Sequence, residues 1–227
     1  MIEFLLLDLD DTILDFKKAE KIALEKTLRH FGIEPTDQVC RRYSQINKDH
    51  WRMLERKELT RPQVLRGRFQ VLFQELGVQA DPQVCSDLYT EDLAVGHYFL
   101  PGAREAVERL SQKYRLSLVS NGNAKVQAGR LDSAGIRPFF EKIFISQELG
   151  ADKPDPVFFE RAFAQIPGFR KDRAMIAGDS LTSDILGGKN AGIATCWVAP
   201  QDIDPGDIRP DHRIERLSQL EGVLERL

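Results

Sequence analysis

Five short apolar runs, separated by stretches of helical character, constrain the fold of this chain more than any other feature. The runs are FLLLDLD at 4–10, RLSLVSNG at 115–122, KIFIS at 142–146, RAMIAGDS at 173–180 and ATCWVAP at 194–200. Strands that are apolar on both faces and are joined by helices are typical of a parallel sheet covered on both sides. The sequence therefore predicts an α/β fold with an open parallel sheet.

A purely helical stretch interrupts this alternation after the first run. Between residues 65 and 76, apolar side chains recur at helical spacing, and Thr60 and Gln63 fit a capping box before them. We expect about four helices that form a small bundle of their own, inserted into the first crossover. The predicted domains are thus 1–15 joined with 98–227, and 16–97.

The composition limits the partners that this chain can have. Its 227 residues carry a formal net charge of -3, which offers no overall attraction to nucleic acid polymers or anionic membranes. No apolar run approaches the length of a signal-peptide core or a membrane span, so we expect a cytoplasmic protein. Cys40, Cys85 and Cys196 are widely spaced and are expected to be reduced, structural thiols. The sequence leaves the oligomeric state open.

Polar residues stand at the ends of the predicted strands, or shortly after them. An open parallel sheet binds its ligands beyond these ends. Two acids spaced two apart after the first strand would point to one side if the strand continued. Clustered carboxylates suit Mg²⁺, while a serine hydroxyl and a lysine suit phosphate oxygens, so the pattern predicts phosphoryl transfer. The residues are Asp8, Asp10, Ser120, Asn121, Lys153, Asp179 and Asp184.

The order of these motifs resembles that of the haloacid dehalogenase (HAD) superfamily. DLDDT at 8–12, Ser120, Lys153-Pro154 and GDSLTSD at 178–184 are similar to its four motifs, and the resemblance spans nearly the whole chain. It implies a Rossmann-like HAD core in which the helical insertion is a C1 cap domain. It also implies Mg²⁺ as cofactor and a small-molecule phosphomonoester as substrate.

The resemblance further implies a catalytic role for individual residues. Asp8 would be the nucleophile that forms an aspartyl-phosphate, and Asp10 would be the general acid and base. Ser120 and Lys153 would bind the phosphoryl group. Dehalogenases of this superfamily lack an acid two residues after the nucleophile, so the presence of Asp10 favours a phosphatase.

A metal site is implied by the same correspondence. Asp8, the backbone carbonyl of Asp10 and Asp179 would hold Mg²⁺. Asp184 would support this site through water or through Lys153. Asp11 has no predicted chemical role and is interpreted as mainly structural.

The substrate class is indicated by a narrower similarity. DLDDTILDF, SNG and GDSLTSDILGG are most similar to the bacterial pyrimidine 5'-nucleotidase subgroup, which implies a nucleoside 5'-monophosphate as substrate. Phe16 and Asn121 are then candidates for contacting the nucleoside. Two alternatives stay open: a phosphatase for phosphoglycolate or small sugar phosphates, and a non-catalytic phosphate-binding protein of the same fold.

Overall fold

The computed structural model describes residues 1–227, apart from the side chain of Glu55. The chain divides into two compact units. The core unit comprises Met1–Phe16 and His97–Leu227, and the helical unit comprises Lys17–Gly96. In the part of the chain that is described, no helix has both the length and the apolar character needed to cross a bilayer.

The core unit contains a six-stranded, entirely parallel sheet, which confirms the predicted α/β class. The strand order is β3-β2-β1-β4-β5-β6, so β1 lies between β2 and β4. The five predicted strands all form, and a sixth, short strand was not predicted. The strands are β1 (Phe4–Leu7), β2 (Arg115–Ser120), β3 (Lys142–Ile145), β4 (Ala174–Gly178), β5 (Ala194–Val198) and β6 (His212–Ile214).

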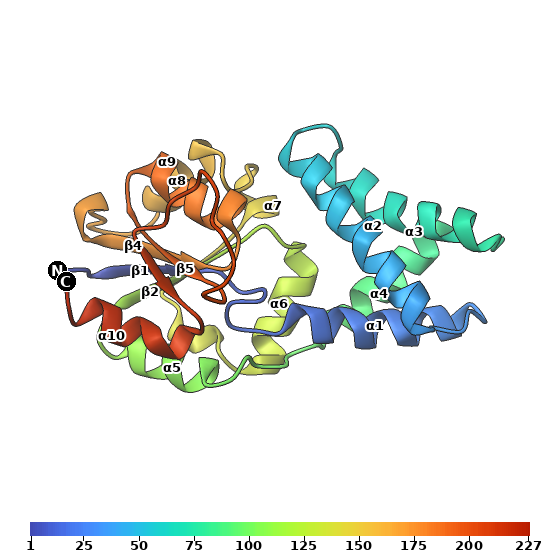
Figure 1. Cartoon of the computed structure of the whole chain (residues 1–227), viewed down its shortest axis with the longest axis horizontal. Coiled ribbons are helices and arrows are strands. Elements are labelled where there is room, and N and C mark those ends of the chain that lie inside the picture. The colour runs from blue at the N-terminus through green and yellow to red at the C-terminus, as the bar shows by residue number, and fades with distance from the viewer. The chain divides into compact units, whose positions relative to one another are not determined.

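Helices cover both faces of this sheet (Figure 1). They are α5 (Ala103–Ser111), α6 (Ala124–Ala134), α7 (Ser146–Leu149), α8 (Pro156–Phe163), α9 (Leu186–Ala191) and α10 (Leu220–Leu224). Leu5 and Leu7 of β1 pack on one face with α5 and α10, whereas Phe4 and Leu6 pack on the other with α8. Each buried side chain of this size contributes about 1.5–3 kcal/mol. A strand with two buried faces therefore has to be apolar throughout.

The helical unit is built from four α-helices, as the periodicity predicts. They are α1 (Phe16–His30), α2 (Asp37–Glu55), α3 (Arg61–Leu76) and α4 (Pro82–Ala94). The predicted capping box is present at α3, where the Thr60 N–H donates to Gln63 Oε1 at 2.8 Å. Gly77 ends the same helix in the left-handed conformation, which a residue without Cβ adopts at little cost.

A buried polar network joins three helices of this unit. Asn47 Nδ2 donates to Glu20 Oε1 at 2.7 Å, and Arg68 Nη1 donates to Asn47 Oδ1 at 2.9 Å. The guanidinium of Arg68 also lies over the ring of Tyr89, 4.7 Å from its centroid. Asn47 thus connects an acid of α1 with a cation of α3.

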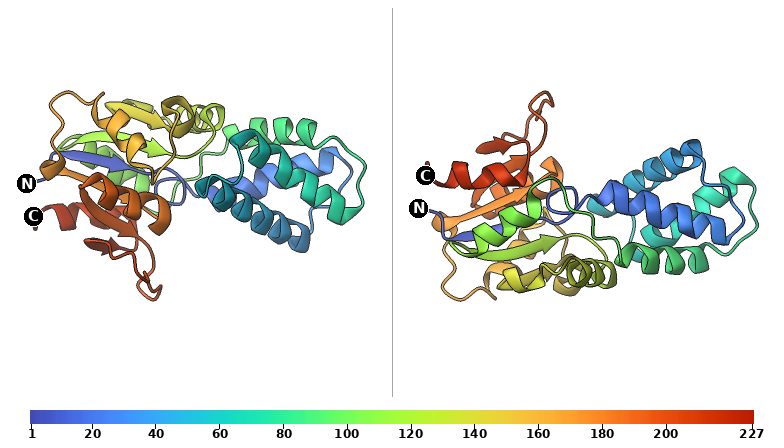
Figure 2. Two further views of the ribbon diagram at one scale, coloured as in Figure 1. Left: turned by 90° about the horizontal axis from the view of Figure 1, so that it is seen from above. Right: turned by 90° about the horizontal axis from the view of Figure 1, so that it is seen from below.

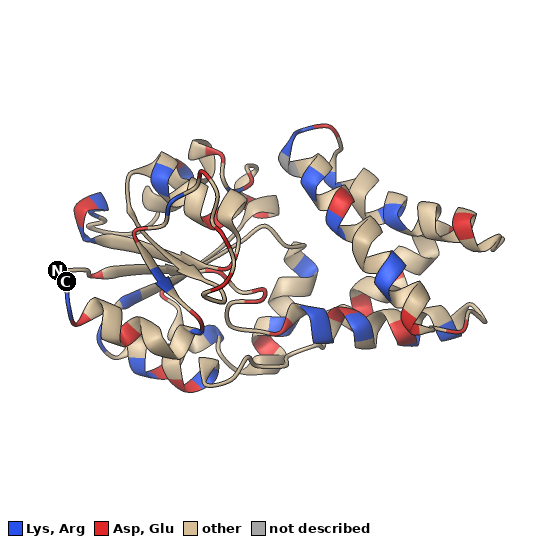
Figure 3. Ribbon diagram, viewed as in Figure 1, with Lys and Arg blue, Asp and Glu red and all other residues tan. Residues whose placement is uncertain are grey.

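The two chain ends lie side by side in the core unit in both views of Figure 2. Lysine and arginine are interspersed with acids along the helices in Figure 3, in keeping with the small net charge of -3. The cysteines Cys40, Cys85 and Cys196 are buried free thiols, and burial raises the pKa of Cys85 and Cys196 to about 12.

Candidate active site

The carboxyl ends of the central strands bring the predicted site residues together. Because β1 pairs with β2 on one side and with β4 on the other, the residues that follow these strands meet at one edge. Asp8 follows β1, Ser120 ends β2 and Asp179 follows β4. Strands β2 and β3 are added on one side of β1, and strands β4, β5 and β6 on the other side. Ligands of open α/β folds bind at such a switch point in the strand order.

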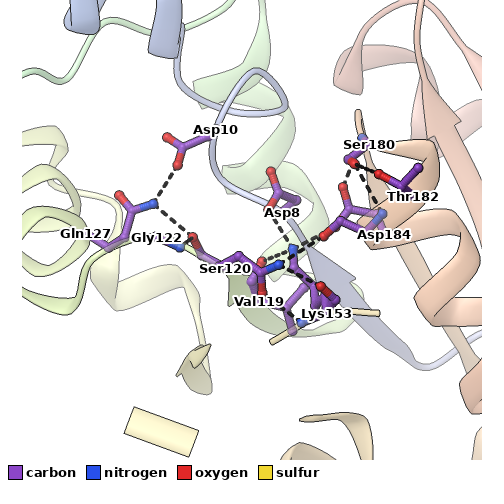
Figure 4. A network of polar contacts seen from close by, with 12 residues as sticks. Asp8, Asp10, Val119, Ser120, Gly122, Gln127, Lys153, Ser180, Thr182 and Asp184 are labelled. Carbon is purple, nitrogen blue, oxygen red and sulfur yellow. Dashed lines mark hydrogen bonds and ion pairs between the residues drawn. The ribbon is translucent and has the colours of Figure 1, made fainter. Parts of the chain in front are cut away.

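Lys153 is the buried cation of this edge (Figure 4). Its side chain is 1% exposed. Its Nζ donates to Asp8 Oδ1 at 2.8 Å, to Asp184 Oδ1 at 2.6 Å and to the carbonyl of Val119 at 2.8 Å. Burial alone would lower the pKa of Lys153, but the carboxylates of Asp184 and Asp8 raise it above its ordinary value. Lys153 therefore stays charged.

Three carboxylates cluster around this lysine. Asp8, Asp179 and Asp184 each place one carboxylate oxygen within 4.8 Å of the others. Burial raises the pKa of Asp8 to about 7, although the charge of Lys153 opposes the shift. Burial, followed by the charges of Asp8 and Asp184, raises the pKa of Asp179 to about 9. Three neighbouring acids repel one another when they are ionised, and a divalent cation fits such a group of hard oxygen donors.

A wide helical turn places Asp184 in this cluster. The sequence predicts one helix over 181–190, but a π-helical segment, Leu181–Ile185, precedes α9. Within this turn the N–H of Ser180 donates to Asp184 Oδ2 at 3.1 Å, while Lys153 holds the other oxygen. A Cβ on Gly178 would lie 2.2 Å from Asp184 Oδ2. The glycine therefore provides the space that the carboxylate occupies.

Trp197 supports the backbone at Asp179. The sequence predicts Trp197 as a core residue, and its side chain is indeed buried in β5. In addition, its indole Nε1 donates to the carbonyl oxygen of Asp179 at 2.7 Å. Sequence reasoning missed this contact because the pairing of β5 beside β4, which brings the two residues together, is not a local property of the chain.

Asn121 fixes the backbone that carries the lysine. Its Nδ2 donates to the carbonyl of Lys153, and the N–H of Lys153 donates to Asn121 Oδ1, both at 2.8 Å. The amide also donates to Ser183 Oγ at 3.3 Å. The structure thus gives Asn121 a positioning contact, and its predicted contact with a nucleoside stays a prediction.

The carboxylate of Asp10 lies apart from the three clustered acids. Since β1 ends at Leu7, the strand does not continue and the expectation that Asp8 and Asp10 share one side does not apply. Arg130 Nη1 donates to Asp10 Oδ1, and Gln127 Nε2 donates to Asp10 Oδ2 at 2.6 Å. Figure 4 shows this carboxylate directed toward Gln127 and away from Asp8.

Gln127 and Arg130 are absent from the sequence-based set of site residues. Their spacing of three on α6 puts them on one helix face, directly after the strand end at Ser120. That spacing was the available signal, but polar residues on a helix are more often solvated. The structure shows instead that both are buried.

Asp11 connects the acidic motif with the first residue of α1. Its φ of 55° is in the left-handed region, and its Oδ1 accepts a hydrogen bond from the N–H of Phe16 at 3.0 Å. This contact agrees with the structural role predicted for Asp11. The ring of Phe16 lies 5.6 Å from the guanidinium of Arg130, and its predicted contact with a nucleoside stays a prediction.

Comparison with known proteins identifies relatives over nearly the full length. The HAD-hydrolase YfnB of Bacillus subtilis is 39% identical over 222 residues, which cover 97% of this chain and 94% of YfnB. The pyrimidine 5'-nucleotidase PynA of Streptococcus pneumoniae is 38% identical over 203 residues, covering 89% of this chain and 86% of PynA. Both relatives therefore share the two units of the chain, and neither match is confined to the core.

Solved structures of similar fold also cover nearly the full length of this chain. The crystal structure of YfnB bound to magnesium superposes with a TM-score of 0.93 and 38% identity over 99% of each chain. The L-2-haloacid dehalogenase of Xanthobacter autotrophicus, at 16% identity and a TM-score of 0.78, shares the fold over 99% of each chain. The family profile described as haloacid dehalogenase-like hydrolase matches residues 5–198. This chain accordingly belongs to the haloacid dehalogenase-like hydrolase family.

Proposed function

We propose that this hydrolase is a Mg²⁺-dependent phosphatase that cleaves nucleoside 5'-monophosphates, pyrimidine nucleotides above all, through an aspartyl-phosphate. The observation that carries the proposal is the pairing of Asp8 with the buried ammonium of Lys153 at 2.8 Å, beside a second acid, Asp10, that is held separately. A nucleophile and a proton carrier need different surroundings, and these two acids have them. The similarity to the nucleotidase PynA supports the substrate class.

The reaction follows from these two carboxylates. An oxygen of Asp8 attacks phosphorus and the bond to the leaving oxygen breaks, while Asp10 donates its proton to that oxygen. Asp10 then takes a proton from the water that attacks the phosphorus of the aspartyl-phosphate. This second displacement returns the Asp8 carboxylate and releases inorganic phosphate.

The metal site is proposed on the same cluster. Asp8 and Asp179, with the backbone carbonyl of Asp10, would hold Mg²⁺, and Asp184 would support them through Lys153 or through water. When bound, the cation supplies positive charge that reduces the repulsion between an anionic nucleophile and a phosphate dianion. The donor set of three carboxylates within 4.8 Å and the magnesium-bound relative YfnB support this assignment.

The remaining side chains would bind the substrate. Ser120 would donate its hydroxyl hydrogen to a phosphoryl oxygen. The positive charge of Lys153 would attract the phosphoryl oxygens. Phe16 and Asn121 are proposed to lie near the nucleoside. We propose the helical unit as the C1 cap and the core unit as the HAD catalytic domain.

The test uses purified wild-type protein, the Asp8→Asn variant and a surface control, Asp132→Asn, whose side chain is 62% exposed. With Mg²⁺, we expect dUMP, dTMP and UMP to be hydrolysed faster than phosphoglycolate and sugar phosphates. Removing the nucleophile should lower kcat at least about a thousandfold. Chelation with EDTA should abolish turnover, and added Mg²⁺ should restore it.

Each part of the proposal has its own contrary result. Near-normal turnover by Asp8→Asn, in a preparation where Asp132→Asn matches the wild type, would rule out the aspartyl-phosphate. Faster hydrolysis of sugar phosphates or phosphoglycolate would rule out the nucleotide assignment. A wild-type protein that hydrolyses no phosphomonoester, p-nitrophenyl phosphate included, would favour the non-catalytic alternative.

A further inference from the structure

We propose that Gln127 and Arg130 are positioning residues that hold Asp10 for proton transfer and direct the hydroxyl hydrogen of Ser120 toward the phosphoryl group. The proposal rests on the proposed function, because both effects act in that reaction. It adds a pair of residues that connects the proton carrier to the phosphate-binding serine.

Both oxygens of Asp10 are held by donors from one helix. Arg130 is completely buried and Gln127 is 1% exposed, although Asp10 itself keeps 29% of its side chain exposed. Arg130 donates to Oδ1 and Gln127 to Oδ2. Charge-assisted hydrogen bonds of this kind are stronger than neutral ones. The carboxylate is therefore fixed in direction while one edge stays open to solvent.

The amide of Gln127 has only one favourable orientation. Arg130 Nη1 donates to its Oε1 at 3.3 Å, so the oxygen faces Arg130. The Nε2 then faces Asp10 at 2.6 Å and Ser120 Oγ at 2.8 Å, with one hydrogen for each. A reversed amide would set an oxygen against the carboxylate of Asp10, which repels it. Arg130 thus acts on Asp10 directly and also through the orientation of Gln127.

The hydroxyl of Ser120 is left with its hydrogen to donate. Its Oγ accepts hydrogen bonds from Gln127 Nε2 at 2.8 Å and from the N–H of Gly122 at 3.1 Å. A hydroxyl has two acceptor lone pairs and one hydrogen. Since two donors occupy the lone pairs, the hydrogen has to point away from both. An anion such as a phosphoryl oxygen is the partner that this orientation suits.

Gly122 provides separate support for the arrangement. A Cβ at this position would lie 2.2 Å from Gln127 Nε2, which is well inside van der Waals contact. The backbone of Gly122 is outside the left-handed region, so a positive φ does not explain the glycine. Gly122, two residues after Ser120, therefore leaves room for the amide of Gln127.

The experiment compares Arg130→Met, Arg130→Lys and Gln127→Met with a control, Arg137→Met, in which an exposed arginine is replaced. Each substitution is made in the wild-type protein and in Asp10→Asn. The substrates are dUMP, whose leaving oxygen needs a proton, and p-nitrophenyl phosphate, whose phenolate leaves without one. Rapid-quench kinetics measure the first phosphoryl transfer, and circular dichroism confirms folding.

Loss of positioning should appear in kcat and should depend on the leaving group. For dUMP, we expect Arg130→Met and Gln127→Met to lower kcat about 10- to 100-fold, with KM nearly unchanged for Arg130→Met. For Arg130→Met, the burst of p-nitrophenol should fall much less, because this substrate needs no proton from Asp10. Arg130→Lys should recover part of the loss. In Asp10→Asn, the change Arg130→Met should cost less than about threefold, because it acts through Asp10.

A purely structural role would give a different pattern. Equal losses of Arg130→Met with both substrates, or the same factor for Arg130→Met with and without Asp10, would overturn the proposal, as would full activity of both methionine variants. If Arg130→Met does not fold, Arg130→Lys and Gln127→Met carry the same comparison. Failure of the proposed function looks different again: the wild type hydrolyses neither substrate, or Asp8→Asn is as active as the wild type.

Discussion

Two glycines at the sheet edge are required for space. A Cβ on Gly122 would meet Gln127, and a Cβ on Gly178 would meet Asp184, each at 2.2 Å from a polar atom. The sequence suggests a tight turn at Gly122, yet neither glycine has a positive φ. Both instead allow a polar side chain of a later helical segment to lie against the strand end.

The close contact between Gly122 and Gln127 predicts the effect of adding one methyl group at Gly122. Gly122→Ala should displace Gln127 and lower kcat for dUMP about 10- to 100-fold, with a stability cost of about 1–3 kcal/mol. Gly222→Ala is the control, because nothing lies within 4 Å of its Cβ position. In a Gln127→Ala background, Gly122→Ala should cost little more. Steady-state kinetics and urea unfolding check both points, and a fully active Gly122→Ala would contradict the steric explanation.

How far single residues can be predicted from the sequence depends on where they stand. Asp8, Ser120 and Asp179 stand at the ends of apolar runs, so the sequence alone places them at the carboxyl edge of the sheet. Gln127 and Arg130 stand inside a helix, where local patterns suggest solvent. Their burial arises from the packing of α6 against the strand ends, and a pattern of neighbouring residues does not contain that information.

At the scale of elements, the helical unit contains a buried polar network beside its apolar core. Amphipathic periodicity predicted its helices, but it did not predict that the side chains of Glu20, Asn47 and Arg68 would meet between them. The reason is that each lies on a different helix. In the core unit, β6 was missed because a three-residue strand with the sequence HRI has no apolar run. The π-helical turn was missed because it depends on the contacts of Asp184.

Asn47 should therefore stabilise the helical unit more than its size suggests. We expect Asn47→Leu to lower the free energy of unfolding by about 1–3 kcal/mol, because the buried Glu20 and Arg68 each lose a partner. Gln45→Leu, at an exposed position of the same helix, should change it by no more than about 0.5 kcal/mol. Urea unfolding followed by circular dichroism measures both. Equal effects of the two substitutions would show that the network adds nothing.

At the scale of the whole molecule, the clustered acids connect folding with pH. The pKa of Asp8 is raised to about 7 and that of Asp179 to about 9, in both cases first by burial. The unfolded chain loses the corresponding protons near the ordinary value of 3.8. Between these limits the native state binds protons that the unfolded state has released. Without metal, the free energy of unfolding must fall as pH rises through this window.

The predicted slope is on the order of 1 kcal/mol per pH unit for each titrating acid. Urea unfolding between about pH 5 and about pH 9 in EDTA should show the decline. Saturating Mg²⁺ should stabilise the protein more at the alkaline end, because a bound cation replaces the protons. Asp179→Asn should flatten the slope in EDTA. Stability that rises with pH in the metal-free protein would contradict the electrostatics of this cluster.

The hydrogen bond from Trp197 to the carbonyl of Asp179 has a practical consequence. The chain contains two tryptophans, and the other, Trp51, lies in the helical unit. A Trp51→Phe protein would contain one tryptophan, Trp197, whose indole is hydrogen-bonded to the backbone of Asp179, a proposed cation ligand. The fluorescence of Trp197 would then report on cation binding at the proposed site, in protein that carries no label.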